Sequence, residues 1–162
     1  MPLPETHPLL NGSTADSALV RAYRGERTSA LPVWFMRQAG RSLPEYRELR
    51  AGGQMLEACL TPELSSEITL QPVRRHGVDA AIFFSDIVVP MKLAGVGVEI
   101  VPGRGPVIEH PIRTASDGAA LRPIDPDSLV PIREGVAAAV EQLGATPLIG
   151  FAVAPFTLAS YL

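Results

Sequence analysis

Residues 32–50 read PVWFMRQAGRSLPEYRELR, and this stretch predicts a strand, a turn and a helix in direct succession. The apolar residues of 31–37 are typical of a buried strand. A glycine-containing turn follows. Ser42 and Glu45 then have the spacing of a capping box, in which both side chains satisfy free backbone N–H groups at a helix start. We therefore expect a helix over 43–51.

Two arginines, Arg37 and Arg41, flank the turn of this strand–helix unit. Guanidinium groups bind carboxylates through paired hydrogen bonds, and the N-terminus of a helix also attracts anions. The loop is therefore a candidate site for an acidic small molecule. Loop arginines are also common as solvated surface groups, and on the residues alone both interpretations stay open.

Two further apolar runs, at 80–84 and 147–153, predict strands that are buried on both faces, as in a parallel sheet. Glycine-punctuated, β-branched residues over 95–112 predict a hairpin. Strands that alternate with helices indicate an α/β fold. The expected helices cover 14–25, 43–51, a segment from Thr61 that Pro72 kinks or ends, a segment from Asp125 to Gly144, and a segment from about Pro155.

The helix expected from Asp125 to Gly144 contains an apolar stripe that predicts its buried face. Gly144 after the stripe is typical of a helix end. The stripe consists of Leu129, Ile132, Val136, Val140 and Leu143.

Ser85 and Asp86 directly follow the apolar run 80–84. By itself, an aspartate after a strand is most simply the N-cap of the next helix. The carboxyl ends of parallel strands are, however, where TIM barrels and open α/β sheets carry their active sites. Asp86 is therefore also a candidate catalytic residue.

The composition is that of a globular domain. The chain has 162 residues, of which 46% are hydrophobic and 19% are charged, and its net charge is −3. This length and apolar content suffice for one hydrophobic core. No basic stretch suggests binding to nucleic acid. Residues 1–13, with three prolines, are expected to be a flexible lead-in.

Cys59 is the sole cysteine, so the chain cannot form an intrachain disulfide. Its apolar, helical surroundings predict a buried structural thiol. His7, His76 and His110 have no metal-ligand spacing with Cys59, and we expect no bound metal. With neither a signal-peptide pattern nor an apolar run of membrane-spanning length, we expect a cytoplasmic protein without membrane contact.

The stretch 32–50 resembles the N-terminal signature of the uroporphyrinogen decarboxylase family, apart from Ser42, where a tyrosine is frequent. The resemblance recurs at FFSDI (83–87) and GFAVAPFTL (150–158), and it extends over 18–162. It implies removal of the four acetate carboxyl groups of uroporphyrinogen III, without metal or organic cofactor. The product is coproporphyrinogen III, an intermediate of haem biosynthesis.

The resemblance selects a TIM (β/α)8 barrel from the possible α/β folds. Such a barrel typically needs about 250 residues, so 14–162 would be its N-terminal part, apparently truncated after about three βα units. The resemblance also implies a homodimer for the full-length protein. We expect the isolated chain to be inactive and to aggregate or pair with itself, because its sheet edge would be open.

The resemblance assigns roles to particular residues. It makes Asp86 and Arg37 catalytic: Asp86 would accept hydrogen bonds from the pyrrole N–H groups and stabilise a ring that becomes cationic on protonation. Arg37 and Arg41 would hold acidic side chains of the substrate. The substrate-binding residues that it implies are Arg37, Gln38, Ala39, Gly40, Arg41, Asp86, Tyr161, Phe84 and Phe151.

Two other readings remain at this stage. Methyltransferases with a zinc-activated thiol and a corrinoid or folate donor share the wider superfamily. The chain could also be a non-catalytic half-barrel that binds a tetrapyrrole or a partner chain. From the residues alone, Tyr161 is a core aromatic with its hydroxyl at the rim, and Phe84 and Phe151 are strand core.

Overall fold

The computed structural model describes residues 3–35 and 42–162. The loop residues Arg37, Gln38, Ala39, Gly40 and Arg41 lie outside the described residues, as does Met36. In chain order the elements are α1 (Pro8–Asn11), α2 (Ala18–Tyr23), α3 (Pro44–Leu49), α4 (Met55–Cys59), α5 (Pro62–His76), β1 (Ala81–Ile82), α6 (Val89–Leu93), β2 (Val98–Val101), β3 (Gly105–Ile108), α7 (Ala115–Ala119), η1 (Pro126–Leu129), α8 (Val130–Leu143), β4 (Leu148–Ile149) and α9 (Pro155–Ala159).

Strands β1 and β4 form a short parallel pair, with Ala81 opposite Leu148 and Ile82 opposite Ile149. Two backbone hydrogen bonds extend the pairing at its ends, from Ala81 N to the Pro147 carbonyl at 2.9 Å and from Phe83 N to the Ile149 carbonyl at 3.0 Å. Parallel strands separated by helices confirm the expected α/β fold.

The strand expected at 31–37 is not a strand over its described part, 31–35. This segment nevertheless lies beside the start of β1, because Asp79 N donates to the Val33 carbonyl at 2.8 Å. Val33 N donates in turn to the Asp79 carboxylate at 2.6 Å, so a side chain takes the place of a backbone partner. Pro32 cannot donate to a ladder, which fits this irregular pairing.

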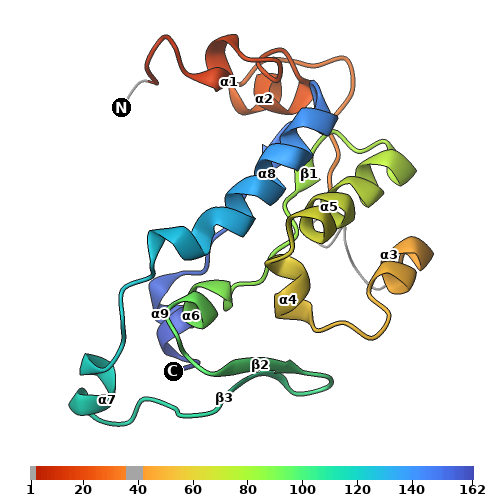
Figure 1. The fold of residues 1–162 in the computed structure, drawn as a ribbon. Helices are drawn as coiled ribbons and strands as arrows, with labels where there is room; N and C mark the ends of the chain where they lie inside the picture. Colours follow the sequence, from red (N-terminus) through yellow and green to blue (C-terminus); the bar gives the residue numbers. More distant parts are fainter. Residues whose placement is uncertain (1–2, 36–41) are drawn as a thin grey trace.

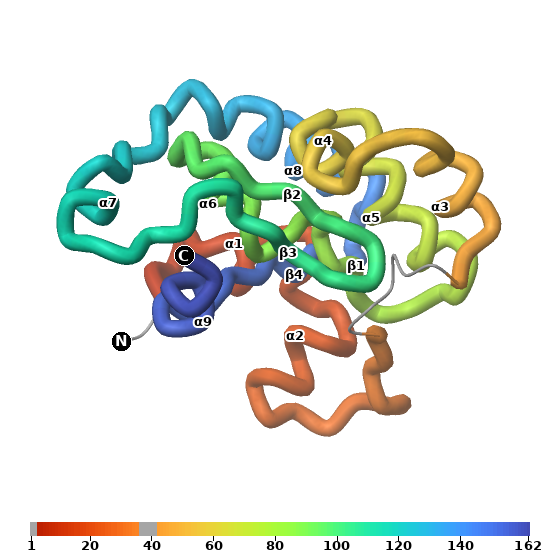
Figure 2. The backbone as a smooth tube through the Cα atoms, turned by 90° about the horizontal axis from the view of Figure 1, so that it is seen from below, coloured from red at the N-terminus to blue at the C-terminus, as the bar shows by residue number. Residues whose placement is uncertain are grey.

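The expected hairpin is confirmed as the antiparallel pair β2–β3, in which Val98 lies opposite Ile108 and Val101 opposite Gly105. Figure 1 shows the hairpin beneath α4, and Figure 2 shows it crossing in front of β1 and α5. Val98 packs into the main hydrophobic core, which also contains Leu56, Ile68, Phe84 and Val88. The hairpin therefore covers the end of the core that lies beyond β1.

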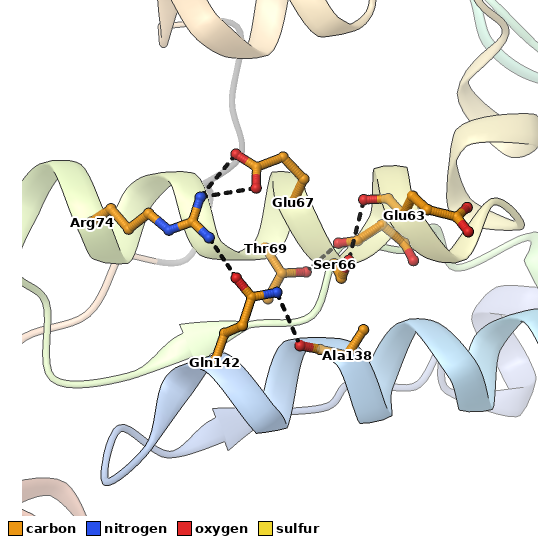
Figure 3. Close-up of polar contacts among 8 residues, drawn as sticks. Glu63, Ser66, Glu67, Thr69, Arg74, Ala138 and Gln142 are labelled. Carbon is orange, nitrogen blue, oxygen red and sulfur yellow. Dashed lines mark hydrogen bonds and ion pairs between the residues drawn. The ribbon is translucent and has the colours of Figure 1, made fainter.

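Helices α5 and α8 lie side by side and form the central layer of the molecule (Figure 1). Polar groups join them at the surface: Arg74 pairs with Glu67 at 2.9 Å and donates to the Gln142 side-chain oxygen at 2.7 Å (Figure 3). Beneath these groups the two helices approach closely. A Cβ atom at Gly135 of α8 would collide with the Ser65 hydroxyl of α5.

This close approach explains why the buried face expected for α8 was only partly right. The buried residues of α8 are Gly135, Ala139 and Leu143. Of the expected stripe, Leu143 is buried and Ile132 packs against the core, but Val140 is 52% exposed. Small residues take the contact face because bulky ones would hold the helices apart.

Three helix termini differ from expectation. The capping box of Ser42 and Glu45 is wrong: α3 has Leu43 at its N-cap without a side-chain bond, and Glu45 pairs with Arg75 at 3.2 Å instead. Of the two outcomes expected at Pro72, a kink or an end, the end is excluded, because α5 continues to His76 and stops at the left-handed Gly77 (φ 60°). The segment from 125 begins as the 3-10 helix η1 and becomes α-helical at Val130.

Packing accounts for the continuation of α5 past its proline. Pro72 belongs to the fully buried side chains, and Ile68, Thr69 and Leu70 around it are buried as well. These contacts offset the loss of one helical hydrogen bond.

Within the described residues no helix is long and apolar enough to cross a membrane.

Candidate active site

The loop from β1 to α6 carries the candidate residues Phe84 and Asp86 at the carboxyl end of a parallel strand. The loop is anchored to α5, because Phe84 N donates to the Thr69 hydroxyl at 2.8 Å. Thr69 is completely buried and donates its own proton to the Ser65 carbonyl at 2.6 Å. This chain of hydrogen bonds fixes the loop to α5.

Asp86 is partly buried just before α6. One of its carboxylate oxygens, Oδ1, accepts a hydrogen bond from Val88 N at 3.0 Å, and its carbonyl accepts one from Val89 N at 3.2 Å. Asp86 thus closes a local turn, whereas the N-cap of α6 is Val88. Val88 N is the sole donor to this carboxylate among the described residues, so the other oxygen can accept a hydrogen bond from a ligand.

The charges of Asp86 and Arg50 both affect the pKa of the Cys59 thiol. The pKa of the Cys59 thiol is raised to about 12, mainly by burial and in addition by the negative charge of Asp86, while Arg50 opposes the shift. The thiol is therefore neutral at physiological pH and is no nucleophile. With 1% of its surface exposed, Cys59 is the buried structural thiol that the sequence predicts.

The aromatic candidates take different positions. Phe84 is 5% exposed, and its ring meets the ring of Tyr46 edge to face, with centroids 6.1 Å apart. Tyr161 is partly buried and packs against the core cluster that contains Phe84. Phe151 follows β4 and is 45% exposed. Phe84 and Tyr161 thus share one core cluster and Asp86 follows Phe84 by two residues, whereas Phe151 is exposed after β4.

A pocket of about 760 Å³ lies between the segment 46–56 and the turn of the β2–β3 hairpin, and we call it the hairpin pocket. Its lining includes Arg47, Arg50, Arg104 and Glu99. Arg50 Nη1 donates to the Gln54 carbonyl at 2.7 Å.

The pocket was missed because its arginines come from segments about fifty residues apart, with no motif to connect them. The available signal was the arginine between two glycines, which places a cation at the tip of a hairpin.

No group of three or more His, Cys, Asp or Glu side chains that could hold a metal ion occurs within 3–35 and 42–162.

Comparisons with known proteins identify the family. The family model described as uroporphyrinogen decarboxylase (URO-D) matches residues 14–162. The chain belongs to the uroporphyrinogen decarboxylase family. The resemblance noted in the three sequence motifs is thereby confirmed.

Curated uroporphyrinogen decarboxylases are similar along nearly the whole chain. The protein of Arthrobacter sp. (strain FB24) is 67% identical over 153 residues, which cover 94% of this chain and 44% of that protein. The protein of Leifsonia xyli subsp. xyli is 62% identical over 165 residues, which cover 99% and 44%. The chain thus spans less than half the length of the curated relatives that it matches.

Among solved structures, a methyltransferase from Methanosarcina mazei has a TM-score of 0.66 and 26% sequence identity. The match covers 90% of this chain and 44% of that protein. A uroporphyrinogen decarboxylase family chain therefore shares its backbone arrangement with a protein of another named activity, and the fold by itself does not select the reaction.

Proposed function

We propose that this chain supplies the N-terminal part of the active site of a uroporphyrinogen decarboxylase. The reaction would convert the four acetate side chains of uroporphyrinogen III to methyl groups and yield coproporphyrinogen III. The observation that carries the proposal is the position of Asp86. It is a partly buried carboxylate after β1, with one oxygen free among the described residues, in a chain whose relatives are decarboxylases.

The chemistry explains why a carboxylate would be needed. When an acetate group loses carbon dioxide, the electrons of the broken carbon–carbon bond need an acceptor. A pyrrole ring that is protonated at carbon can take them, which leaves an exocyclic methylene. The methylene then gains a proton to become methyl, and the ring loses the proton that it had taken up at carbon. The protonated ring is cationic, and a fixed carboxylate close to it stabilises the transition state more than the ground state. Asp86 would have this role.

Arg37 and Arg41 would bind the acidic side chains of the substrate, with the intervening Gln38, Ala39 and Gly40 beside them. Arg37 would orient the carboxylate that leaves. A guanidinium group stays protonated in almost any protein site, so the proton for the ring would come from another donor, such as a bound water. Tyr161 would contact a substrate carboxylate, and Phe84 and Phe151 would be apolar walls.

We further infer that the chain forms about the first three units of a TIM barrel. Within 3–35 and 42–162, β4 pairs with β1 alone, and this supports the inference, as does the length of the relatives, more than twice the span that is matched. A TIM barrel carries its active site at the carboxyl ends of its strands, where Asp86 lies. The full-length protein would be a homodimer in the cytoplasm.

The test is to join this chain to the C-terminal remainder of the Arthrobacter relative and to supply enzymatically reduced uroporphyrinogen. We expect porphyrin chromatography to show stepwise loss of carboxyl groups from eight to four. In the same protein, Asp86→Asn removes the charge but keeps an oxygen acceptor for Val88 N, and should lower kcat about a hundredfold or more. Asp16→Asn, at an exposed position, is the control. A folded chimaera without product, or an Asp86→Asn variant with full activity, would contradict the proposal.

A further inference from the structure

The hairpin pocket has a strong excess of positive charge. Arg47, Arg50 and Arg104 contribute three guanidinium groups, and Glu99 is the one acid of the lining. Within the described part of the chain, none of these arginines forms an ion pair; the pairs found there are Arg21–Glu26, Arg74–Glu67 and Arg75–Glu45. Cations that share a cavity repel one another, and an anion between them would relieve the repulsion.

The pocket arginines are oriented by backbone groups that leave their charge unneutralised. Arg47 donates to the Ser42 carbonyl at 3.3 Å, and Arg50 to the Gln54 carbonyl at 2.7 Å. The Arg50 Nε atom is buried and has no acceptor among the described residues. A buried donor without a partner is unfavourable, and a carboxylate oxygen in the pocket would supply one.

The hairpin gives Arg104 a defined position. Gly103 and Gly105 on either side of it have φ values of 78° and 89°, which are accessible to glycine and rarely to other residues. The ladder of β2 and β3 closes directly at this turn, with Val101 opposite Gly105. Figure 1 shows the turn extending toward the side of the molecule where α3 lies. Arg104 therefore stands at the rim of the pocket, opposite the segment that carries Arg47.

The pocket borders the candidate active site. Tyr46 lines the pocket, and its ring contacts Phe84, two residues before Asp86. Arg50 also lines the pocket, and its charge acts on Cys59 together with that of Asp86. A ligand that lies over Asp86 and carries several acidic side chains could thus extend one of them into the pocket.

We propose that the hairpin pocket binds carboxylate side chains that the reaction does not remove, through Arg104 and Arg47. This inference rests on the proposed function, in which four of the eight carboxylates of the substrate persist in the product. Guanidinium forks suit carboxylates, and two of them from separate segments select a ligand with acidic groups at its periphery. Arg104 and Arg47 act as substrate-positioning residues at a distance from the groups that react.

The experiment is a fluorescence titration of the 162-residue chain with uroporphyrin, which has eight carboxylates, and coproporphyrin, which has four. Both are stable oxidised forms. Arg104→Gln and Arg47→Gln should each raise Kd for both porphyrins by about three- to tenfold, the range of one exposed charge-assisted contact. Arg104→Lys should recover part of the affinity. Arg133→Gln, an exposed α8 arginine outside the pocket, is the matched control and should leave Kd unchanged.

Comparison of the two porphyrins gives the decisive result. Equal weakening for both means that the arginines hold the carboxylates common to substrate and product. Weakening for uroporphyrin alone would overturn the proposal, because the arginines would then bind acetates. Unchanged affinity in an Arg47→Gln/Arg104→Gln double variant would overturn it as well and leave the proposed function intact.

Absence of porphyrin binding by a folded wild-type chain would also overturn the pocket proposal. Turnover by the chimaera with the Arthrobacter remainder would then judge the proposed function independently. The variants change exposed side chains, and thermal unfolding followed by circular dichroism checks that they leave the fold intact.

Discussion

At the residue scale, Cys59 and Asp86 are two titratable groups near the same end of α4 and β1 that differ in their burial. Cys59 sits among the fully buried side chains of the core, where a thiolate would lose its hydration. Asp86, a few residues past β1, is only partly buried and keeps a backbone hydrogen bond to its carboxylate. Burial holds the Cys59 thiol neutral. The Asp86 carboxylate is more exposed, and one of its oxygens has no donor among the described residues.

The raised thiol pKa of Cys59 makes stability depend on pH in a defined direction. The pKa is about 12 in the folded chain and near the ordinary value of 9.0 in the unfolded chain. The contribution is fully present below pH 9, and it is lost as pH rises from 9 toward 12, because the unfolded thiol ionises first. Urea unfolding at pH 8 and pH 10.5 should show a larger loss of stability for the wild type than for Cys59→Ala. Equal losses in both proteins would contradict a buried neutral thiol.

At the element scale, the sequence predicts what local chemistry decides and fails where a distant segment intervenes. The start of α5, the hairpin and the end of α8 at Gly144 follow from local patterns and are confirmed. The Ser42 cap fails because Glu45 has Arg75 as a partner, thirty residues away. The α8 stripe fails because α5 selects glycine and alanine at the contact. The arginines of the hairpin pocket are likewise distant in the sequence and line one pocket only in the folded chain.

The contact of α5 and α8 predicts that Gly135→Ala destabilises the protein when residue 65 is serine and stabilises it when residue 65 is alanine. Gly135→Ala places a Cβ against the Ser65 hydroxyl, and overpacking of this kind costs about 1–3 kcal/mol. In a Ser65→Ala background the hydroxyl is gone, and the helix propensity of alanine should then stabilise α8 by up to about 1 kcal/mol. Chemical denaturation of the four proteins of this double-mutant cycle measures the coupling. Additive effects would show that the helices do not touch at Gly135.

At the scale of the whole molecule, the segments that flank the parallel pair β1–β4 carry exposed apolar side chains. Leu31, 88% exposed, and Phe35, 52% exposed, belong to the segment that lies beside the start of β1. Phe151, 45% exposed, follows β4, and Phe156, 86% exposed, lies on α9. In an antiparallel domain such residues would alternate with polar ones. Here the exposed side chains at both edges are apolar, as expected where further strands and helices pack against a sheet. This agrees with the inferred barrel.

The exposed edges predict that the isolated chain associates with itself. An open strand edge and clustered apolar side chains promote pairing between copies. Sedimentation velocity over a range of concentrations should show species larger than a monomer. Phe151→Glu with Phe156→Glu should shift the distribution toward the monomer, since two charges on the edge oppose pairing. Leu121→Glu, at a 43% exposed position after α7, places a charge away from β4 and should have little effect.

The same two substitutions should act in the opposite sense once the chain is joined to the remainder of its Arthrobacter relative. There the residues would be covered by the following strands and helices, and burial of unpaired carboxylates would destabilise the domain by several kcal/mol. The edge variant should therefore be the more soluble form of the isolated chain and the less stable form of the chimaera. If it remains as stable as the wild type in the chimaera, β4 and α9 are not the surface on which the rest of the barrel packs.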